Sequence, residues 1–408
     1  MSTQVAERRP APPTQRRNGR QWWTAASPGW LGVLLGFLAL FVAIPPLTIR
    51  SSVPTIVLGV AGVIAGAWAI RNGERRVGWG AIAAAIVGTA VGIAATKSGV
   101  SNLERVVVWS ALFAAMLRFA TPLLFAALGG VISERSGVIN IGLEGMMLMG
   151  AFWGIWGADQ TGSWLLGLLI GMASGVVLAL IHAVWSITLR ADQIVSGFSM
   201  NFLALGITGF FYVNIYGNQG TPEGIPRAPD VHLPVIEDIG FVGDIIGQLN
   251  ILVWLGLATV VLLWLYLFHT PSGLRLRSVG ENPLAAETAG LSPARIRYRA
   301  VATSGALAAI GGAYLSIGFV GSFGENMTAG RGYIGLAVMI CGRWLPQGAL
   351  IFALLFGFFS ALAQRLPVFS ESAATLFQAL PYVVTLIAVA GVVGKSIPPA
   401  ADGRPLDR

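Results

Sequence analysis

The sequence predicts an all-α polytopic membrane protein with about 10–12 transmembrane helices. The chain has 408 residues, of which 55% are hydrophobic and only 11% are charged, and its mean hydropathy is +0.73. A soluble domain carries roughly 25% charged residues, so this composition excludes an ordinary soluble enzyme. The 53 glycines agree with a membrane location, because small residues let helices approach closely in lipid.

Residues 1–29 form a polar, basic segment that we expect to be a disordered cytoplasmic tail. Five arginines in this segment stand against a single acid, Glu7, and Lys and Arg accumulate on the cytoplasmic side of membrane proteins. The same rule accounts for the net charge of +8, so we expect lipid and not nucleic acid as the surroundings of this chain. N-terminal transmembrane helices follow in residues 30–105.

Twelve apolar runs follow the tail, each near the roughly 20 residues that cross a bilayer. Their expected ranges are 30–49, 53–70, 77–96, 106–128, 139–158, 163–189, 194–216, 248–269, 299–320, 329–345, 347–365 and 376–395. The short run at 329–345 could instead be re-entrant, which would reduce the count to ten or eleven. Glycines four residues apart, such as Gly88 with Gly92, predict close packing between these helices.

The charges of the two longest loops predict a topology with both termini in the cytoplasm. The loop 217–247 holds five acids against only Arg227, so we expect it outside. The loop 270–298 holds four arginines, Arg297 among them, against two acids, so we expect it inside. The chain then ends in a short cytoplasmic tail at 396–408, and the protein is placed in the cytoplasmic membrane as a multi-pass protein.

The stretch from Gly129 to Phe152, GGVISERSGVINIGLEGMMLMGAF, predicts a broken helix. It contains six glycines, and each glycine in a helix costs roughly 1 kcal/mol relative to alanine. Transporters use broken helices near the middle of the membrane, where freed backbone groups can meet a substrate.

Three polar side chains at membrane depth are candidates for the substrate pathway. Glu144 must face protein or water, because a carboxylate at the bilayer centre costs about 2.5–3.5 kcal/mol. It either braces a neighbouring helix, for example by pairing with Arg118, or contacts substrate. The amides of Asn140 and Asn201 suit a neutral polar solute, yet buried amides also hold helices together.

The stretch GENPLAAETAG from Gly280 to Gly290 predicts a short helix in the cytoplasmic loop. Asn282 followed by Pro283 is typical of a helix start, and Gly290 is typical of a helix end. Such a helix is either an ordinary connector at the membrane surface or a docking element for a soluble partner.

The chain contains no motif of a catalytic or ATP-binding centre. It has no GxxxxGK[ST] phosphate loop, no HExxH and no GxSxG. Its one cysteine, Cys341, excludes an internal disulfide and a multi-cysteine metal site, and three scattered histidines give no metal cluster. We therefore expect no enzyme activity, no cofactor and no metal, and we expect another chain to hydrolyse any ATP.

Three stretches carry a resemblance to a known family. Gly129 to Phe152 resembles the signature of permease subunits of ABC importers in the branched-chain amino acid and simple sugar permease superfamily. Its sequence is similar to that of the nucleoside (guanosine-type) branch. Gly280 to Gly290 resembles the coupling loop of that family, and Gly330 to Gly357 resembles a later conserved segment. Together they make residues 106–395 similar to a type II ABC importer permease.

The resemblance implies sites and partners. Asn140, Glu144 and Gly145 would lie on a discontinuous helix near the translocation path, with Asn201 as a further polar residue. The resemblance places five residues on a coupling helix that docks in a groove of the cytoplasmic ATPase: Glu281, Asn282, Ala285, Ala286 and Gly290. It also implies a second permease subunit and an extracytoplasmic substrate-binding lipoprotein. Three spans before the core and a long arginine-rich tail depart from the family pattern.

Three other functions stay open from the sequence. A permease of the same superfamily could carry simple sugars or branched-chain amino acids. An ion-coupled secondary transporter would need broken helices in both halves of the chain, and we find one. A membrane enzyme would need a cluster of titratable groups, for which Glu134, Arg135 and Glu144 are the candidates, without a nucleophile.

Overall fold

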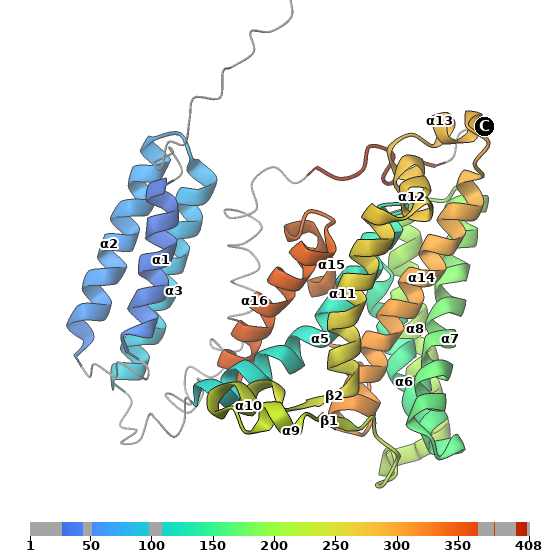
Figure 1. The fold of residues 1–408 in the computed structure, drawn as a ribbon, viewed down its shortest axis with the longest axis horizontal. Coiled ribbons are helices and arrows are strands. Elements are labelled where there is room, and N and C mark those ends of the chain that lie inside the picture. The colour runs from blue at the N-terminus through green and yellow to red at the C-terminus, as the bar shows by residue number, and fades with distance from the viewer. Residues whose placement is uncertain (1–26, 44–50, 98–107, 366–378, 380–396, 406–408) are drawn as a thin grey trace, which may run out of the picture.

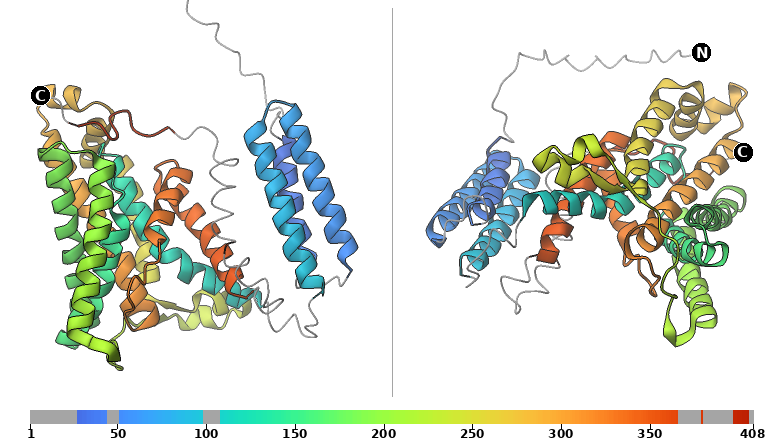
Figure 2. Two further views of the ribbon diagram at one scale, coloured as in Figure 1. Left: turned by 180° about the vertical axis from the view of Figure 1, so that it is seen from behind. Right: turned by 60° about the horizontal axis from the view of Figure 1, so that its bottom comes forward.

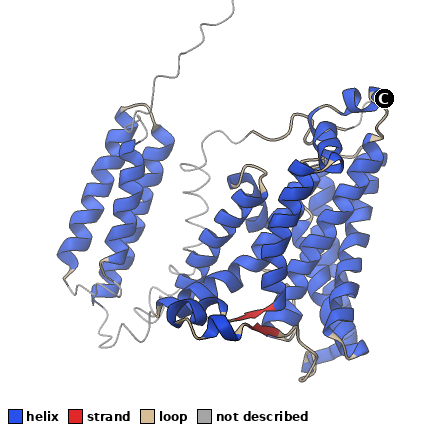
Figure 3. Ribbon diagram, in the orientation of Figure 1, coloured by secondary structure: helices blue, strands red, loops and turns tan. Residues whose placement is uncertain are grey.

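The structure of the chain is a computed structural model. It describes residues 27–43, 51–97, 108–365, 379 and 397–405. Figure 1 shows a group of three helices from the first part of the chain and a larger helical core that contains the rest. Figure 3 shows that helices make up nearly all of the described part, together with one pair of short strands.

The first three helices pack backbone against backbone. They are α1 (Ser27–Phe41), α2 (Ser52–Arg71) and α3 (Arg75–Lys97). A Cβ atom built on Gly88 would lie only 2.0 Å from the carbonyl oxygen of Gly36, and one built on Gly92 would lie 2.7 Å from that of Ala39. The predicted close packing at these glycines is therefore confirmed. One end of the group contacts the core, where Phe37 and Phe41 lie against Phe359 and Trp109.

The core begins with four long helices. These are α5 (Trp109–Glu134), α6 (Leu143–Thr161), α7 (Trp164–Ala183), which continues as the π-helix η1 (Val184–Thr188), and α8 (Gln193–Tyr216). Figure 2 shows α6, α7 and α8 side by side at the edge of the core that lies away from the first three helices.

A small outer structure follows α8. It consists of the 3₁₀ turn η2 (Gly217–Gln219), strand β1 (Asp230–His232), helices α9 (Pro234–Glu237) and α10 (Gly240–Ile246), and strand β2 (Gln248–Asn250). The strands are antiparallel, with Asp230 opposite Asn250. The Asn250 side chain then accepts a hydrogen bond from the backbone N–H of Leu252 and so starts the next helix.

The remaining elements complete the core. They are α11 (Ile251–His269), α12 (Pro271–Glu281), α13 (Pro283–Thr288), α14 (Pro293–Ala313), which continues as the π-helix η3 (Tyr314–Val320), α15 (Arg331–Cys341) and α16 (Pro346–Arg365). Helices α12 and α13 lie at the end of the core opposite α9, α10 and the strands (Figure 1). The two loops with opposite charge therefore lie at opposite ends, as a bilayer between them requires.

The described residues contain eight helices that are long and apolar enough to cross a membrane, which confirms a multi-pass α-helical protein. The expected crossing at 329–345 is wrong as a full span, because α15 has 11 residues and reaches only about 16 Å of a hydrocarbon layer about 30 Å thick. Arg297 was expected in a charged loop, but it lies in α14 and is fully buried. The expected span at 376–395 lies outside the described residues, apart from residue 379.

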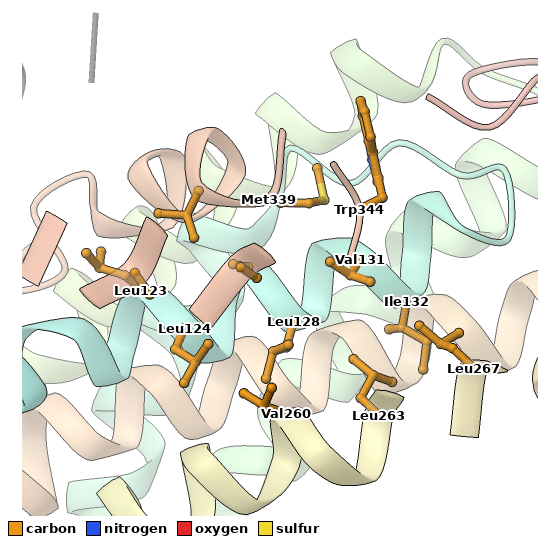
Figure 4. Packing of buried hydrophobic residues seen from close by; sticks show 14 of the residues in the cluster. Leu123, Leu124, Leu128, Val131, Ile132, Val260, Leu263, Leu267, Met339 and Trp344 are labelled. Carbon is orange, nitrogen blue, oxygen red and sulfur yellow. The ribbon is translucent and has the colours of Figure 1, made fainter. Parts of the chain in front are cut away.

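A buried apolar cluster joins α5 to α11, α15 and α16. Figure 4 shows Leu124 and Leu128 of α5 against Val260 of α11, with Met339 of α15 on the other side of α5. Leu128 and Met339 are fully buried. This packing fixes the short helix α15 against α5.

Candidate functional site

The predicted break in the Gly129–Phe152 stretch is confirmed. Helix α5 ends at Glu134 and α6 begins at Leu143, so residues 135–142 connect two helices within the core. Gly137 lies in this connection with φ of +87°, a conformation that side chains other than glycine adopt only at a cost. We call residues 135–142 the break segment.

Glu144 lies in the first turn of α6 and binds the start of a second helix. Its carboxylate accepts hydrogen bonds from the backbone N–H groups of Gly330, at 2.8 Å, and Gly332, at 2.5 Å. Both N–H groups belong to the N-terminus of α15. The positive ends of α6 and α15 therefore converge on one buried carboxylate, which is the charge that helix N-termini favour. The expected pair with Arg118 is not formed, and the Arg118 side chain is exposed.

Asn201 of α8 connects three backbone or side-chain groups. Its Oδ1 accepts a hydrogen bond from the N–H of Gly145 at 2.8 Å, and its Nδ2 donates to the carbonyl of Ile141 at 3.0 Å and to the hydroxyl of Tyr333 at 2.9 Å. A Cβ on Gly145 would lie 2.7 Å from the carbonyl oxygen of Met200, so this glycine permits the close approach of α6 and α8.

Asn140 holds the break segment against α14. Its Nδ2 donates to the hydroxyl of Ser304 at 3.0 Å, and its Oδ1 accepts from the N–H of Gly142 at 3.1 Å. Ser304 lies near the middle of the apolar stretch Pro293–Val320, so Asn140 lies well inside the core.

Two residues that the sequence analysis missed complete this network. Gln193 of α8 accepts a hydrogen bond from the N–H of Ile139 at 2.8 Å, and His182 Nε2 lies 3.1 Å from the Ile139 carbonyl. A carbonyl only accepts, so Nε2 carries the proton and Nδ1 accepts from the hydroxyl of Ser196 at 2.9 Å. A polar signal was present in the sequence, since His182 interrupts the apolar run 163–189.

The structure therefore brings Asn140, Glu144, Gly145 and Asn201 into one buried network. The side chains of Asn140, Glu144 and Asn201 bond to groups of α6, α14 and α15 instead of pointing into open space. This geometry favours the brace interpretation over direct substrate contact for the three polar side chains. Because an unpaired buried polar group is costly, the network can rearrange only if several helices move together.

Replacing Asn201 with alanine tests the network on α8. The change would leave the Gly145 N–H and the Ile141 carbonyl without a partner, so we expect the free energy of unfolding to fall by about 2–4 kcal/mol. The measurement is a denaturant titration of the purified protein in detergent.

Asn214→Ala is the matched control. Asn214 is exposed on the same helix and donates only to the Phe210 carbonyl of that helix. Equal stability losses in the two variants would contradict a bracing role for Asn201.

The predicted short helix in the cytoplasmic loop is confirmed as α13. Asn282 caps it by accepting the N–H of Ala285 at 3.0 Å, Pro283 occupies the first helical position, and Gly290 follows the helix with φ of +83°. Helix α12 precedes it and was not expected.

The exposure of the five predicted coupling residues is uneven. Glu281, Asn282, Ala285 and Gly290 are exposed, whereas Ala286 is buried with 4% of its surface exposed. Ala286 therefore supports α13 from inside and cannot contact a partner without unfolding it. The sequence analysis missed Leu284, which is 56% exposed at the start of α13. An exposed leucine on a short surface helix is the kind of side chain that fits a partner's groove.

Several proteins that are similar to this chain are permease components of ABC transporters. The family described as the branched-chain amino acid transport system permease component matches residues 112–389. The nucleoside ABC transporter permease protein NupC of Lactococcus lactis subsp. cremoris is 40% identical over 299 residues, which cover 71% of this chain and 94% of that protein. The guanosine ABC transporter permease protein NupQ of Bacillus subtilis is 40% identical over 300 residues, with the same coverage of 71% and 94%.

A relative named for a different substrate is also similar. The putative glucose ABC transporter permease protein TsgC13 of Haloferax volcanii is 37% identical over 250 residues, which cover 60% of this chain and 74% of that protein. No solved structure matches the chain. Helices α1, α2 and α3 lie before the matched residues 112–389.

Proposed function

This chain belongs to the permease component family of branched-chain amino acid transport systems, and we propose that it is the membrane permease subunit of an ATP-driven nucleoside importer. The observation that carries the proposal is its 40% identity to two permeases named for nucleosides and guanosine, over 94% of the length of each. Guanosine and related purine nucleosides are the substrates we expect. Simple sugars are the second candidate class, because the glucose-named relative is 37% identical.

We propose that the buried network around the break segment frames the translocation path. Asn140, Glu144, Gly145 and Asn201 would hold α6, α8, α14 and α15 in register on one side of that path. Tyr333 extends from the network to the surface of the core: its hydroxyl bonds to Asn201, and 38% of its surface is exposed. Its ring stacks on that of Phe198 at 6.1 Å between ring centres. A paired aromatic surface beside hydrogen-bonding groups suits the planar, neutral base of a nucleoside.

The coupling function is assigned to α13. Glu281, Asn282, Leu284, Ala285 and Gly290 would face a cytoplasmic ABC ATPase, with Ala286 supporting them from inside. ATP hydrolysis then belongs to the ATPase, and this chain has no enzymatic role. A second, similar permease chain and an extracytoplasmic substrate-binding lipoprotein would complete the importer.

The proposed orientation follows from these assignments. With α13 in the cytoplasm, the loop with α9, α10 and the strands faces outward, and both chain termini lie inside. The permease core of residues 106–395 would cross the membrane with the three N-terminal helices of residues 30–105 beside it. This orientation matches the basic charge of loop 270–298.

The proposal is tested by uptake of radiolabelled guanosine, adenosine, uridine, glucose and leucine in cells with and without this gene. We expect guanosine and adenosine uptake to fall when the gene is absent, and to fall in its presence when ATP is depleted. A proton uncoupler that leaves ATP intact should have little effect.

Each other outcome points to a named alternative. Loss of glucose or leucine uptake with unchanged nucleoside uptake would move the substrate to sugars or branched-chain amino acids. Nucleoside uptake that persists without ATP and follows the proton gradient would overturn the ABC assignment.

A further inference from the structure

Residues 397–405 lie across the end of the core that carries α12 and α13. We call this segment the C-terminal strap. Its residues contact α12, α14 and the break segment, at positions that precede them by about a hundred residues or more. The strap therefore contacts both the coupling region and the break segment. The proposed function assigns no role to the strap itself.

On one side the strap bonds to the end of α12, directly before α13. The N–H of Ala401 donates to the carbonyl of Gly280 at 2.9 Å, and the N–H of Ala400 donates to the Glu281 carboxylate at 3.3 Å. Glu281 adjoins Asn282, the cap of α13. The strap is therefore connected to the start of α13 by the hydrogen bonds of two backbone N–H groups.

On the other side the strap is tied to the break segment through Arg297 of α14. The guanidinium is fully buried, donating from Nε to the carbonyl of Ser136 at 3.2 Å and from Nη1 to the carbonyl of Arg404 at 3.0 Å. One rigid, planar side chain thus joins the break segment to the strap. Lysine could not replace it, because an ammonium lacks the fixed fork of donors.

The strap also lies in close contact with the start of the break. A Cβ on Gly137 would lie 2.8 Å from Arg297 Nη2 and 3.1 Å from the carbonyl oxygen of Ala401. The Asp402 carboxyl lies near that of Glu134, the last residue of α5, and burial raises the pKa of Asp402 to about 7.

We propose that the C-terminal strap is a positioning element that transmits movement of α13 to the break segment, and so couples the ATPase cycle to the substrate path. The inference rests on the proposed function. Its physical basis is that α12 and the break segment also meet by steric contact at Gly280, whose Cβ would lie 2.1 Å from the Arg135 carbonyl oxygen. A steric contact resists only the approach of α12 to the break segment. The hydrogen bonds on both sides of the strap also resist their separation.

The test compares uptake per ATP hydrolysed in the reconstituted importer, because a purely structural loss lowers uptake and hydrolysis together. One variant ends at residue 396 and lacks the strap. A second, Ala401→Pro, keeps the strap but removes the N–H that bonds to Gly280. We expect both to assemble with the ATPase and to transport roughly tenfold less substrate per ATP, the effect of losing about one hydrogen bond of coupling.

Arg404→Ala is the matched control, because the strap uses the carbonyl of Arg404 while its side chain is exposed. We expect this variant to keep the wild-type ratio. An unchanged ratio in Ala401→Pro would overturn the inference, and so would loss of assembly in both strap variants, since the strap would then only hold the fold together. If wild-type protein shows ATP hydrolysis without nucleoside uptake, the proposed function fails instead.

Discussion

Glu144→Ala is expected to abolish uptake and to lower the free energy of unfolding by about 3–5 kcal/mol. The carboxylate is 7% exposed and satisfies the N–H groups of Gly330 and Gly332 at the start of α15. Removing it leaves two buried donors and the positive ends of two helices without an acceptor. Uptake normalised to the amount of protein in the membrane, together with a denaturant titration in detergent, measures both effects.

Glu325→Gln is the control for this prediction. Glu325 is an exposed carboxylate that lies five residues before Gly330, so its loss changes the charge of the same segment without touching the network. It should transport and unfold as the wild type does. If Glu144→Ala keeps normal uptake, the network is not needed for transport, and the proposed frame of the path is wrong.

Leu284→Arg combined with Ala285→Arg is expected to release the ATPase. Both side chains are exposed on α13, and a charged group forced into an apolar groove without a partner costs about 3 kcal/mol, or roughly a hundredfold in affinity. The measurement is co-purification of the ATPase with a tagged copy of this chain, followed by titration of the two components. The permease should remain in the membrane at wild-type abundance.

Leu274→Arg provides the comparison. Leu274 is 59% exposed on α12, so the change places one arginine at a comparably exposed leucine outside α13. Retention of the ATPase by this variant, and its loss in the α13 variant, would assign docking to α13. Comparable binding by both would contradict that assignment. Ala286→Arg cannot serve here, because Ala286 is buried and its replacement would disrupt α13 itself.

Local sequence signals were sufficient for the break and for α13. Six glycines between Gly129 and Phe152 weaken a continuous helix, and the structure breaks there. Asn282 followed by Pro283 and, later, Gly290 are signals that act within a few residues, so the boundaries of α13 follow from them. The resemblance identified the family, and the match of that family to residues 112–389 of this chain confirms it.

The partners of the buried polar groups could not be predicted in the same way. Glu144 bonds to Gly330 and Gly332, which lie 186 and 188 residues away, and nothing near Glu144 specifies that contact. Arg297 was assigned to a loop because it is one of four arginines in residues 270–298, a cluster that predicts solvated charges. Its burial depends on Ser136 and Arg404, 161 and 107 residues away. Only tertiary packing decides such pairs.

The central claim is tested most directly by guanosine accumulation in vesicles that contain the complex purified through a tagged copy of this chain. Radiolabelled guanosine is supplied on the outer side, with its binding protein, and ATP on the side that carries α13. The account predicts accumulation above the outside concentration with ATP and none with a non-hydrolysable ATP analogue. Accumulation that needs only a proton gradient, or transport of glucose with none of guanosine, would contradict it.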